Sequence, residues 1–212
     1  MHPQNRILIT AAIFAAIFAA ILFASCTNTQ APPATQADTL QQPKDNEEIK
    51  AMVQIDQQMR MEDKPGLEEQ DEKHRKRIFE MLANGLVRTP KDKFGAALIL
   101  QHTGLAYCNN ELKSLSAENY FLAYQLSKSA GDAGDTTALY FSAVTLDRYL
   151  SMTQGYQKYG TQKFYDEKTD AMLWAPIDST TTDAERARFG IKPLAELLKE
   201  TPMKPWPKPA AK

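Results

Sequence analysis

The chain has 212 residues, with 25 Lys and Arg against 26 Asp and Glu, which gives a formal net charge of −1. This balance provides no strongly basic surface, so nucleic acid is not an expected partner. The two cysteines are Cys26 and Cys108. If Cys26 carries a lipid, the exported part cannot form an intramolecular disulfide.

The start of the chain is typical of an export signal. Arg6 precedes an apolar run at residues 7–24 that only Thr10 interrupts. The run leads into the sequence LFASC at residues 22–26, which resembles the lipobox of bacterial lipoproteins. Cleavage before Cys26 and lipid attachment to it are therefore expected. The alternative is an uncleaved membrane anchor, because a run of 18 residues approaches the length of about 20 that spans a bilayer.

Lipid attachment predicts where the protein works. Acyl chains on Cys26, such as palmitate, would anchor it in a membrane, since each buried methylene contributes about 0.8 kcal/mol. Thr27, and not Asp, follows the cysteine, which by resemblance to Gram-negative sorting rules favours the periplasmic side of the outer membrane. The sequence thus predicts a lipid-anchored protein of the cell envelope.

Composition divides the chain into four parts. Residues 1–25 form the predicted signal peptide, and residues 26–44, rich in Thr, Gln, Ala and Pro, form the lipidated cysteine and a flexible stalk. Residues 45–200 have the length of one domain with a single core. Residues 201–212 contain four prolines and form an expected frayed tail, in which Trp206 can dock.

The domain is expected to be mainly α, a single compact fold of about six or seven helices with one small β-hairpin. Asp45 and Glu48 have capping-box spacing at the start of a first helix over about residues 46–62. A second helix runs from Leu67 to a C-cap at Asn84.

The third helix has the clearest start in the chain, with Thr89 as N-cap and Pro90 as its first residue, and is expected to continue through Leu105. Four further helices follow from cap residues and apolar spacing. Their expected limits are Ser116 to Gly131, Asp135 to about Met152, Thr182 to Gly190, and Pro193 through Leu198. Residues 159–165 and 171–175 are predicted to form the hairpin around a polar turn.

His74 and His102 are the only histidines after the predicted cleavage site. If both lie on helices, His74 shares a face with Asp71, and His102 shares one with Leu98 and Leu105, so both rings should face inward. One interpretation is two core histidines with satisfied hydrogen bonds. The other is a polar pocket lined by Asp56, Arg60, His74, Gln101, His102, Asp147 and Arg148.

Ion pairing is the simpler interpretation for the charged members of that set. Asp56 with Arg60, and Asp147 with Arg148, are more often structural pairs than catalytic groups, because buried charges need partners. Two histidines and an acid could bind zinc, but no His-Glu-x-x-His spacing supports a metal site, so no metal is predicted.

Other catalytic signatures are also missing from the sequence. It has no Gly-x-Ser-x-Gly elbow and no glycine-rich phosphate loop, so no catalytic residue and no cofactor is predicted. Cys108 follows the apolar residues 105–107, which favours a buried small side chain over an intermolecular thiol.

Three motifs resemble an uncharacterised bacterial family. They are TLDR at residues 145–148, QKYGTQ at 157–162 and GIKPL at 190–194. In that family, a helix ending in Asp-Arg leads to a Gln-x-Tyr-Gly-Thr-Gln loop and a closing Gly-Leu-Pro-Pro-Leu helix. The family also tends to have Asp, Arg and Gln-His at the places of Asp56, Arg60 and Gln101-His102. The sequence GLVRTP at residues 85–90 departs from it, because the family has Gly-Trp-Pro there. The resemblance implies a helical fold and a set of residues, but no activity.

The QKYGTQ segment is expected to be a loop, in which Gly160 permits a left-handed turn. Its polar side chains either attach the loop to helix ends, which is the favoured interpretation, or contact a ligand. These residues are Gln157, Tyr159, Thr161 and Gln162.

The leading functional hypothesis is a lipid-anchored binding module without catalysis, whose partners are the membrane and either an envelope protein or a small ligand. One alternative is an envelope hydrolase with His74 or His102 as general base, oriented by Asp71 or Asp147. Another is an immunity or inhibitor lipoprotein that caps a toxin through an exposed apolar or acidic patch.

Overall fold

The computed structural model describes residues 43–108, 111–166 and 169–204. The predicted signal peptide, Cys26, nearly all of the stalk and Trp206 lie outside these ranges, as does the side chain of Cys108. The described part is mainly α-helical, as expected. Its helices are α1 (Glu47–Met61), α2 (Leu67–Ala83), α3 (Pro90–Leu100), α4 (Glu118–Asp132), α5 (Thr136–Gln154), α6 (Asp183–Arg188) and α7 (Leu194–Glu200).

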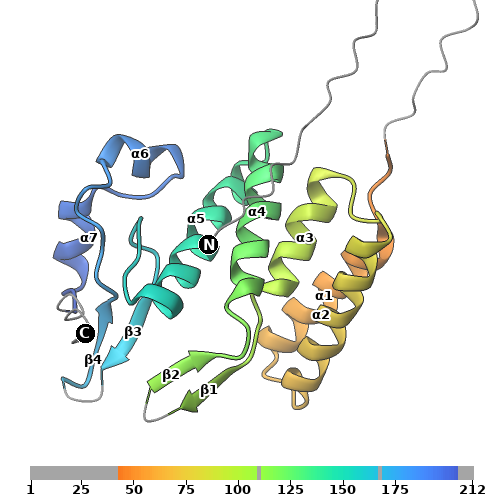
Figure 1. Ribbon diagram of the computed structural model, residues 1–212, viewed down its shortest axis with the longest axis horizontal. Coiled ribbons are helices and arrows are strands. Elements are labelled where there is room, and N and C mark those ends of the chain that lie inside the picture. The colour runs from red at the N-terminus through yellow and green to blue at the C-terminus, as the bar shows by residue number, and fades with distance from the viewer. Residues whose placement is uncertain (1–42, 109–110, 167–168, 205–212) are drawn as a thin grey trace, which may run out of the picture. The chain divides into compact units, whose positions relative to one another are not determined.

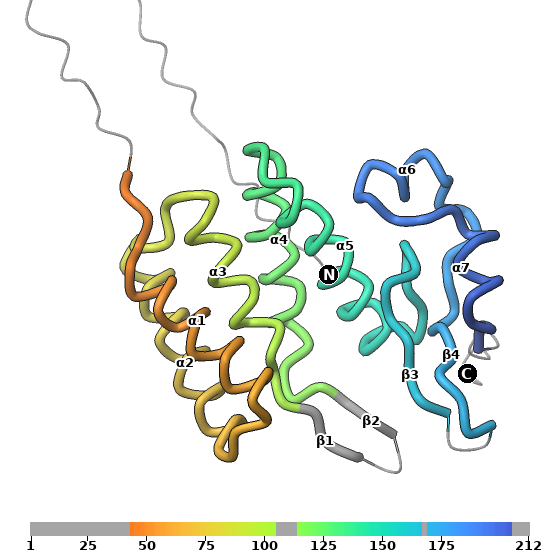
Figure 2. Tube along the Cα trace, turned by 180° about the vertical axis from the view of Figure 1, so that it is seen from behind, coloured from red at the N-terminus to blue at the C-terminus, as the bar shows by residue number. Residues whose placement is uncertain are grey.

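Helices α1, α2 and α3 pack side by side, α4 packs against α3, and α5 packs against α4 (Figures 1 and 2). The core between the first helices is made of aliphatic side chains at helical spacing, among them Ile49, Ile78, Met81 and Leu100. Burying each of these side chains contributes about 1.5–3 kcal/mol. Gly95 of α3 leaves room for the Ile49 side chain of α1, because a Cβ at Gly95 would lie 2.7 Å from that side chain.

Local cap residues explain most of the helix starts. The Thr89 hydroxyl accepts a hydrogen bond from the N–H of Asp92, and the Asp92 carboxylate accepts one from the N–H of Thr89. The predicted start of α3 is therefore confirmed, with a full capping box. Asp135 caps α5 and Thr182 caps α6, each by accepting from the N–H three residues later.

Two predicted caps are wrong. Asn46, and not Asp45, caps α1, because its side chain accepts from the backbone of the first turn. Helix α4 has Ala117 at its N-cap without a side-chain bond, and the Ser116 hydroxyl donates to Glu118 instead. Both errors shift a boundary by about one residue, which is the usual uncertainty at a helix end.

The predicted hairpin forms between β3 (Lys163–Asp166) and β4 (Ala171–Trp174), which pair antiparallel. A second antiparallel hairpin, β1 (Leu105–Cys108) with β2 (Glu111–Ser114), was not predicted. The expectation that the third helix continues through Leu105 is wrong, because α3 ends at Leu100.

Thr103 and Gly104 explain why the chain leaves the helix there. The Thr103 hydroxyl donates to the Leu100 carbonyl at 2.9 Å, and the Gly104 carbonyl accepts from the N–H of Leu115. The helical face proposed for Leu98, His102 and Leu105 therefore does not exist.

A second core lies beyond α5 and contains Tyr159, Trp174, Ile177 and Leu197. The Trp174 indole donates to the Leu197 carbonyl at 2.9 Å, which attaches β4 to α7. Residues 201–204, expected to fray, instead bond to β4, since Trp174 exchanges backbone hydrogen bonds with Pro202 and Lys204. Within the described ranges, no helix is long and apolar enough to cross a membrane.

Candidate functional site

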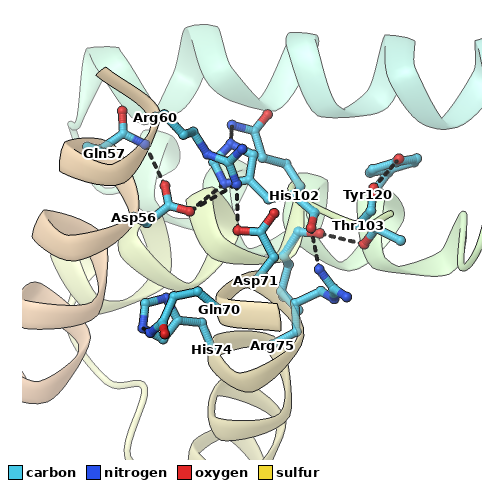
Figure 3. A network of polar contacts seen from close by, with 12 residues as sticks. Asp56, Gln57, Arg60, Gln70, Asp71, His74, Arg75, His102, Thr103 and Tyr120 are labelled. Atoms are coloured by element: carbon cyan, nitrogen blue, oxygen red, sulfur yellow. Dashed lines mark hydrogen bonds and ion pairs between the residues drawn. The ribbon is translucent and has the colours of Figure 1, made fainter. Parts of the chain in front are cut away.

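A charged network joins α1, α2 and the end of α3. Asp56 and Arg60 lie one turn apart on α1, and the Arg60 Nη2 is 3.1 Å from Asp56 and 2.6 Å from Asp71 of α2. His102 follows the C-cap of α3, and its Nδ1 is 2.9 Å from the same Asp56 oxygen that Arg60 contacts. Figure 3 shows both carboxylates turned toward Arg60. The predicted Asp56–Arg60 ion pair therefore exists, with Asp71 and His102 added to it.

The hydrogen bonds of His102 define its tautomer. Asp56 can only accept when it is ionised, so Nδ1 of His102 carries a proton and donates. The other ring nitrogen, Nε2, is 3.2 Å from the amide nitrogen of Gln101 and can accept from it when the ring is neutral. The backbone carbonyl of His102 accepts from Arg75 (Figure 3). The contacts at the two ring nitrogens thus hold the imidazole in one orientation.

Asp56 remains ionised over the physiological range. Burial alone would raise the pKa of its carboxyl group, but the hydrogen bonds and charges of His102 and Arg60 outweigh burial and lower the pKa to about 2. Its side chain is 1% exposed, so the carboxylate depends on these partners for its stability.

A pocket of about 320 Å³ opens beside this network. Three basic side chains and one acidic side chain line it, together with neutral polar groups and an apolar wall. The lining residues are Arg60, Asp71, Gln101, His102, Thr103, Tyr120, Arg148, Met152, Gln162, Lys163 and Phe164. Five of the residues that the sequence singled out thus meet in one place: Arg60, Gln101, His102, Arg148 and Gln162.

Arg148 of α5 has only neutral partners among the described residues. Its Nε donates to the Gln162 side chain at 3.2 Å, and its Nη1 lies 3.4 and 3.5 Å from the side-chain and backbone oxygens of Gln101. The guanidinium carbon is 5.8 Å from the centre of the Tyr120 ring. Burial lowers the pKa of Arg148, and the charge of Arg60 lowers it further. The predicted Asp147–Arg148 ion pair is wrong.

Asp147 instead binds the QKYGTQ loop. Its Oδ1 accepts from the N–H groups of Lys158 and Tyr159, and its Oδ2 accepts from the N–H groups of Gly160 and Thr161 and from the Thr161 hydroxyl. The side chain is fully buried, and burial raises its pKa against the opposing effect of these bonds. Asp147 therefore lies behind the pocket and does not line it.

Gln157 completes the attachment of this loop. Its Oε1 accepts from the N–H groups of Thr161 and Gln162, and its Nε2 donates to the carbonyls of Gln162 and Ala175. Tyr159 packs in the second core. Gln157, Tyr159 and Thr161 therefore attach the loop, as the favoured interpretation predicted, whereas Gln162 lines the pocket.

His74 is separate from the pocket lining. It is 4% exposed, its Nε2 lies 2.5 Å from the Gln70 amide nitrogen, and its buried Nδ1 has no hydrogen-bond partner among the described residues. Burial lowers the pKa of this imidazole. His74 is therefore a buried, neutral histidine, as the simpler of the two interpretations expected, but the hydrogen bonding expected of it is only half made (Figure 3).

Asp56, Asp71 and His102 offer ligand atoms that lie within 4.8 Å of one another, which is a spacing suited to a metal ion. However, the Arg60 guanidinium already bonds to both carboxylates. A cation bound there would have to displace Arg60, so the donor set fits an internal ion-pair network better than a metal centre.

Several lining residues were not candidates on the sequence: Thr103, Tyr120, Met152, Lys163 and Phe164. Met152 could have been found, since it lies one turn after Arg148 on the same helix. Thr103, Lys163 and Phe164 could not, because they lie where a helix ends and where a short strand begins.

No known family model, curated protein or solved structure matches this chain. The class of this protein is therefore defined by its fold and site alone. It is a mainly α-helical domain with a charged network beside a polar pocket. The resemblance of the QKYGTQ region to an uncharacterised bacterial family stays a prediction.

Proposed function

We propose that this protein is a lipid-anchored cell-envelope protein whose helical domain binds a small ligand in the pocket beside His102 and Arg148. The observation that carries the proposal is the pocket itself, because concave sites with a few oriented polar groups and an apolar wall are the usual sites of small molecules.

The polar groups of this pocket are held in place before any ligand arrives. His102 is fixed between Asp56 and Gln101, and Arg148 is fixed between Gln162 and Tyr120. Side chains that are already ordered lose little conformational entropy on binding, which favours affinity. Preorganisation of this kind supports a binding site over an accidental surface depression.

The anchor can be tested independently of the pocket. Growing the producing cells with an alkyne-tagged palmitate should label the wild-type protein and place it in the membrane fraction. The Cys26→Ser variant should lose the label, whereas Cys108→Ser should keep it as the matched control. Equal labelling of the wild type and the Cys26→Ser variant would overturn the lipid anchor.

Ligand binding can be tested by blocking the pocket. Native mass spectrometry of the full chain in detergent, after exposure to a small-molecule extract of cell envelopes, should reveal a retained mass. Met152→Trp should abolish retention, because the indole would fill space beside Arg148. Met61→Trp, at an 80% exposed position outside the pocket, is the matched control and should retain the mass. Equal retention by all three proteins, or none by the wild type, would overturn the proposal.

Hydrolysis is the second candidate, and one observation favours it. His102 donates to Asp56 from Nδ1, which leaves Nε2 directed at Gln101 on the pocket wall, as a general base oriented by a carboxylate requires. The orienting acid in this version is Asp56, in place of Asp71 or Asp147. The test is turnover of cell-wall peptides or esters. If the wild type turns them over, and His102→Ala abolishes turnover while His74→Ala preserves it, the protein is a hydrolase and its role is not limited to binding.

A further inference from the structure

The charge of Arg148 is not compensated within the described structure. All of its hydrogen bonds to described residues go to neutral oxygens, and two of them, at 3.4 and 3.5 Å, are long for N–H···O bonds. No bond from its Nη2 reaches a described residue. Removing a cation from water without an acidic partner is costly, so such a group is stabilised when an anion binds to it.

Arg60, the neighbouring guanidinium, is in the opposite situation. It bonds to both Asp56 and Asp71, so its charge is already neutralised. Of the two guanidinium groups in this pocket, Arg148 is therefore the one that remains available to an incoming negative charge.

The rest of the lining reinforces this preference. Lys163 of β3 adds a positive charge, with its Nζ 4.2 Å from the centre of the Trp174 ring. Among the lining residues that the structure describes, Asp71 is the only acid, and it is paired with Arg60. Electrostatic attraction in such a cleft is stronger than on open surface, because its walls exclude water.

We infer that the pocket binds the oxyanion group of a small ligand, a carboxylate or a phosphate, against the Arg148 guanidinium. This inference rests on the proposed function and specifies its ligand class. The planar guanidinium can donate two parallel hydrogen bonds to either group, with Nη2 as one donor. The remainder of the ligand packs against Tyr120, Met152 and Phe164.

Ligand-observed NMR with three probes tests the chemistry. N-acetylglycine carries a carboxylate, N-acetylglycinamide has the same shape without charge, and inorganic phosphate supplies the other oxyanion. Each is titrated at constant ionic strength into the full chain in detergent. Saturable binding of N-acetylglycine, phosphate or both is expected, with the neutral amide at least tenfold weaker than the carboxylate.

Variants place the binding on Arg148. Arg148→Gln should weaken oxyanion binding at least tenfold. Arg88→Gln makes the same charge change at an exposed arginine outside the pocket and should leave binding unchanged. If Arg148→Gln does not fold, Arg148→Lys keeps the charge without the planar fork and should weaken binding severalfold.

The outcomes separate this inference from the function on which it rests. Equal saturable binding of N-acetylglycine and its amide, blocked by Met152→Trp, would overturn the oxyanion while keeping the pocket as a ligand site. Saturable oxyanion binding that both Arg148 variants preserve would overturn the role of Arg148. No saturable binding of any probe would overturn the inference, and the extract experiment would still decide the function separately.

Discussion

Asp147 and Arg148 are adjacent on α5, yet their charged groups lie on different sides of the helix and have different partners. Asp147 is buried and accepts five hydrogen bonds from the QKYGTQ loop, whereas Arg148 lines the pocket with only neutral partners among the described residues. Successive residues of a helix point about 100° apart, so neighbours in sequence rarely pair. The loop therefore depends on one residue, and the pocket depends on the next.

Replacing Asp147 should detach the loop. In Asp147→Asn, an amide NH₂ would face at least one of the N–H donors that the carboxylate now accepts, and the charge would be lost. We expect a loss of about 3 kcal/mol in the free energy of unfolding, in the range for a buried polar group that loses partners. Urea unfolding measures it. Asp132→Asn, at an exposed ion pair with Lys128, should change stability by less than about 1 kcal/mol.

Acid should weaken the Asp56 network. The pKa of Asp56 is about 2 in the folded protein, below its ordinary value of 3.8. The carboxylate therefore contributes stability above about pH 4 and loses it as the pH falls toward 2, by about 2 kcal/mol in total. Measured between pH 2 and 7, the stability gap between wild type and Asp56→Asn should narrow on acidification. A gap that stays constant would contradict the linkage.

His74 should also make the stability of the protein sensitive to acid, in a higher pH range than Asp56. Burial lowers its pKa below the ordinary 6.5, so the unfolded chain binds a proton more readily than the folded protein. Stability is then complete above about pH 6.5 and falls as the pH drops below it. His74→Leu should flatten the profile of stability against pH immediately below pH 6.5. An unchanged slope would show that His74 is protonated equally in both states.

Substitutions at two glycines can distinguish the stability cost of backbone strain from that of steric overlap. Gly160 and Gly134 both have positive φ, +98° and +104°, but a Cβ at Gly160 would lie 2.6 Å from Leu197, while nothing lies within 4 Å at Gly134. Gly134→Ala should cost about 1 kcal/mol from backbone strain alone. Gly160→Ala should cost about 2–4 kcal/mol, because the packing of α7 must also shift. Thermal unfolding measures the loss of stability in each variant. Equal losses would show that the overlap with Leu197 adds no cost.

Where prediction succeeded, the signal was local. The starts of α3, α5 and α6 depend on a side chain that bonds to the backbone three residues later, and Thr89, Asp135 and Thr182 stand at those places. The loop glycine at residue 160 likewise reports a local backbone conformation.

Where prediction failed, the deciding partner was distant in sequence. The end of α3 depends on the pairing of β1 with β2 and on the hydrogen bond between Gly104 and Leu115, which lie on either side of that hairpin. His102 pairs with Asp56, 46 residues away, and Arg148 reaches Gln101, 47 residues away.

The sequence by itself determined the mainly helical fold, most of the helix starts, the hairpin near residues 159–175, and the identity of five pocket residues. Those features follow from periodicity, caps and residue chemistry, which act over a few positions. Only the tertiary structure decided which carboxylate pairs with which cation. The packing of α1, α2 and α3 pairs Asp56 and Asp71 with Arg60, and Asp147 accepts hydrogen bonds from the QKYGTQ loop. Arg148 is left in the pocket without an acid among the described residues, because charge pairing depends on distances in space that sequence spacing does not specify.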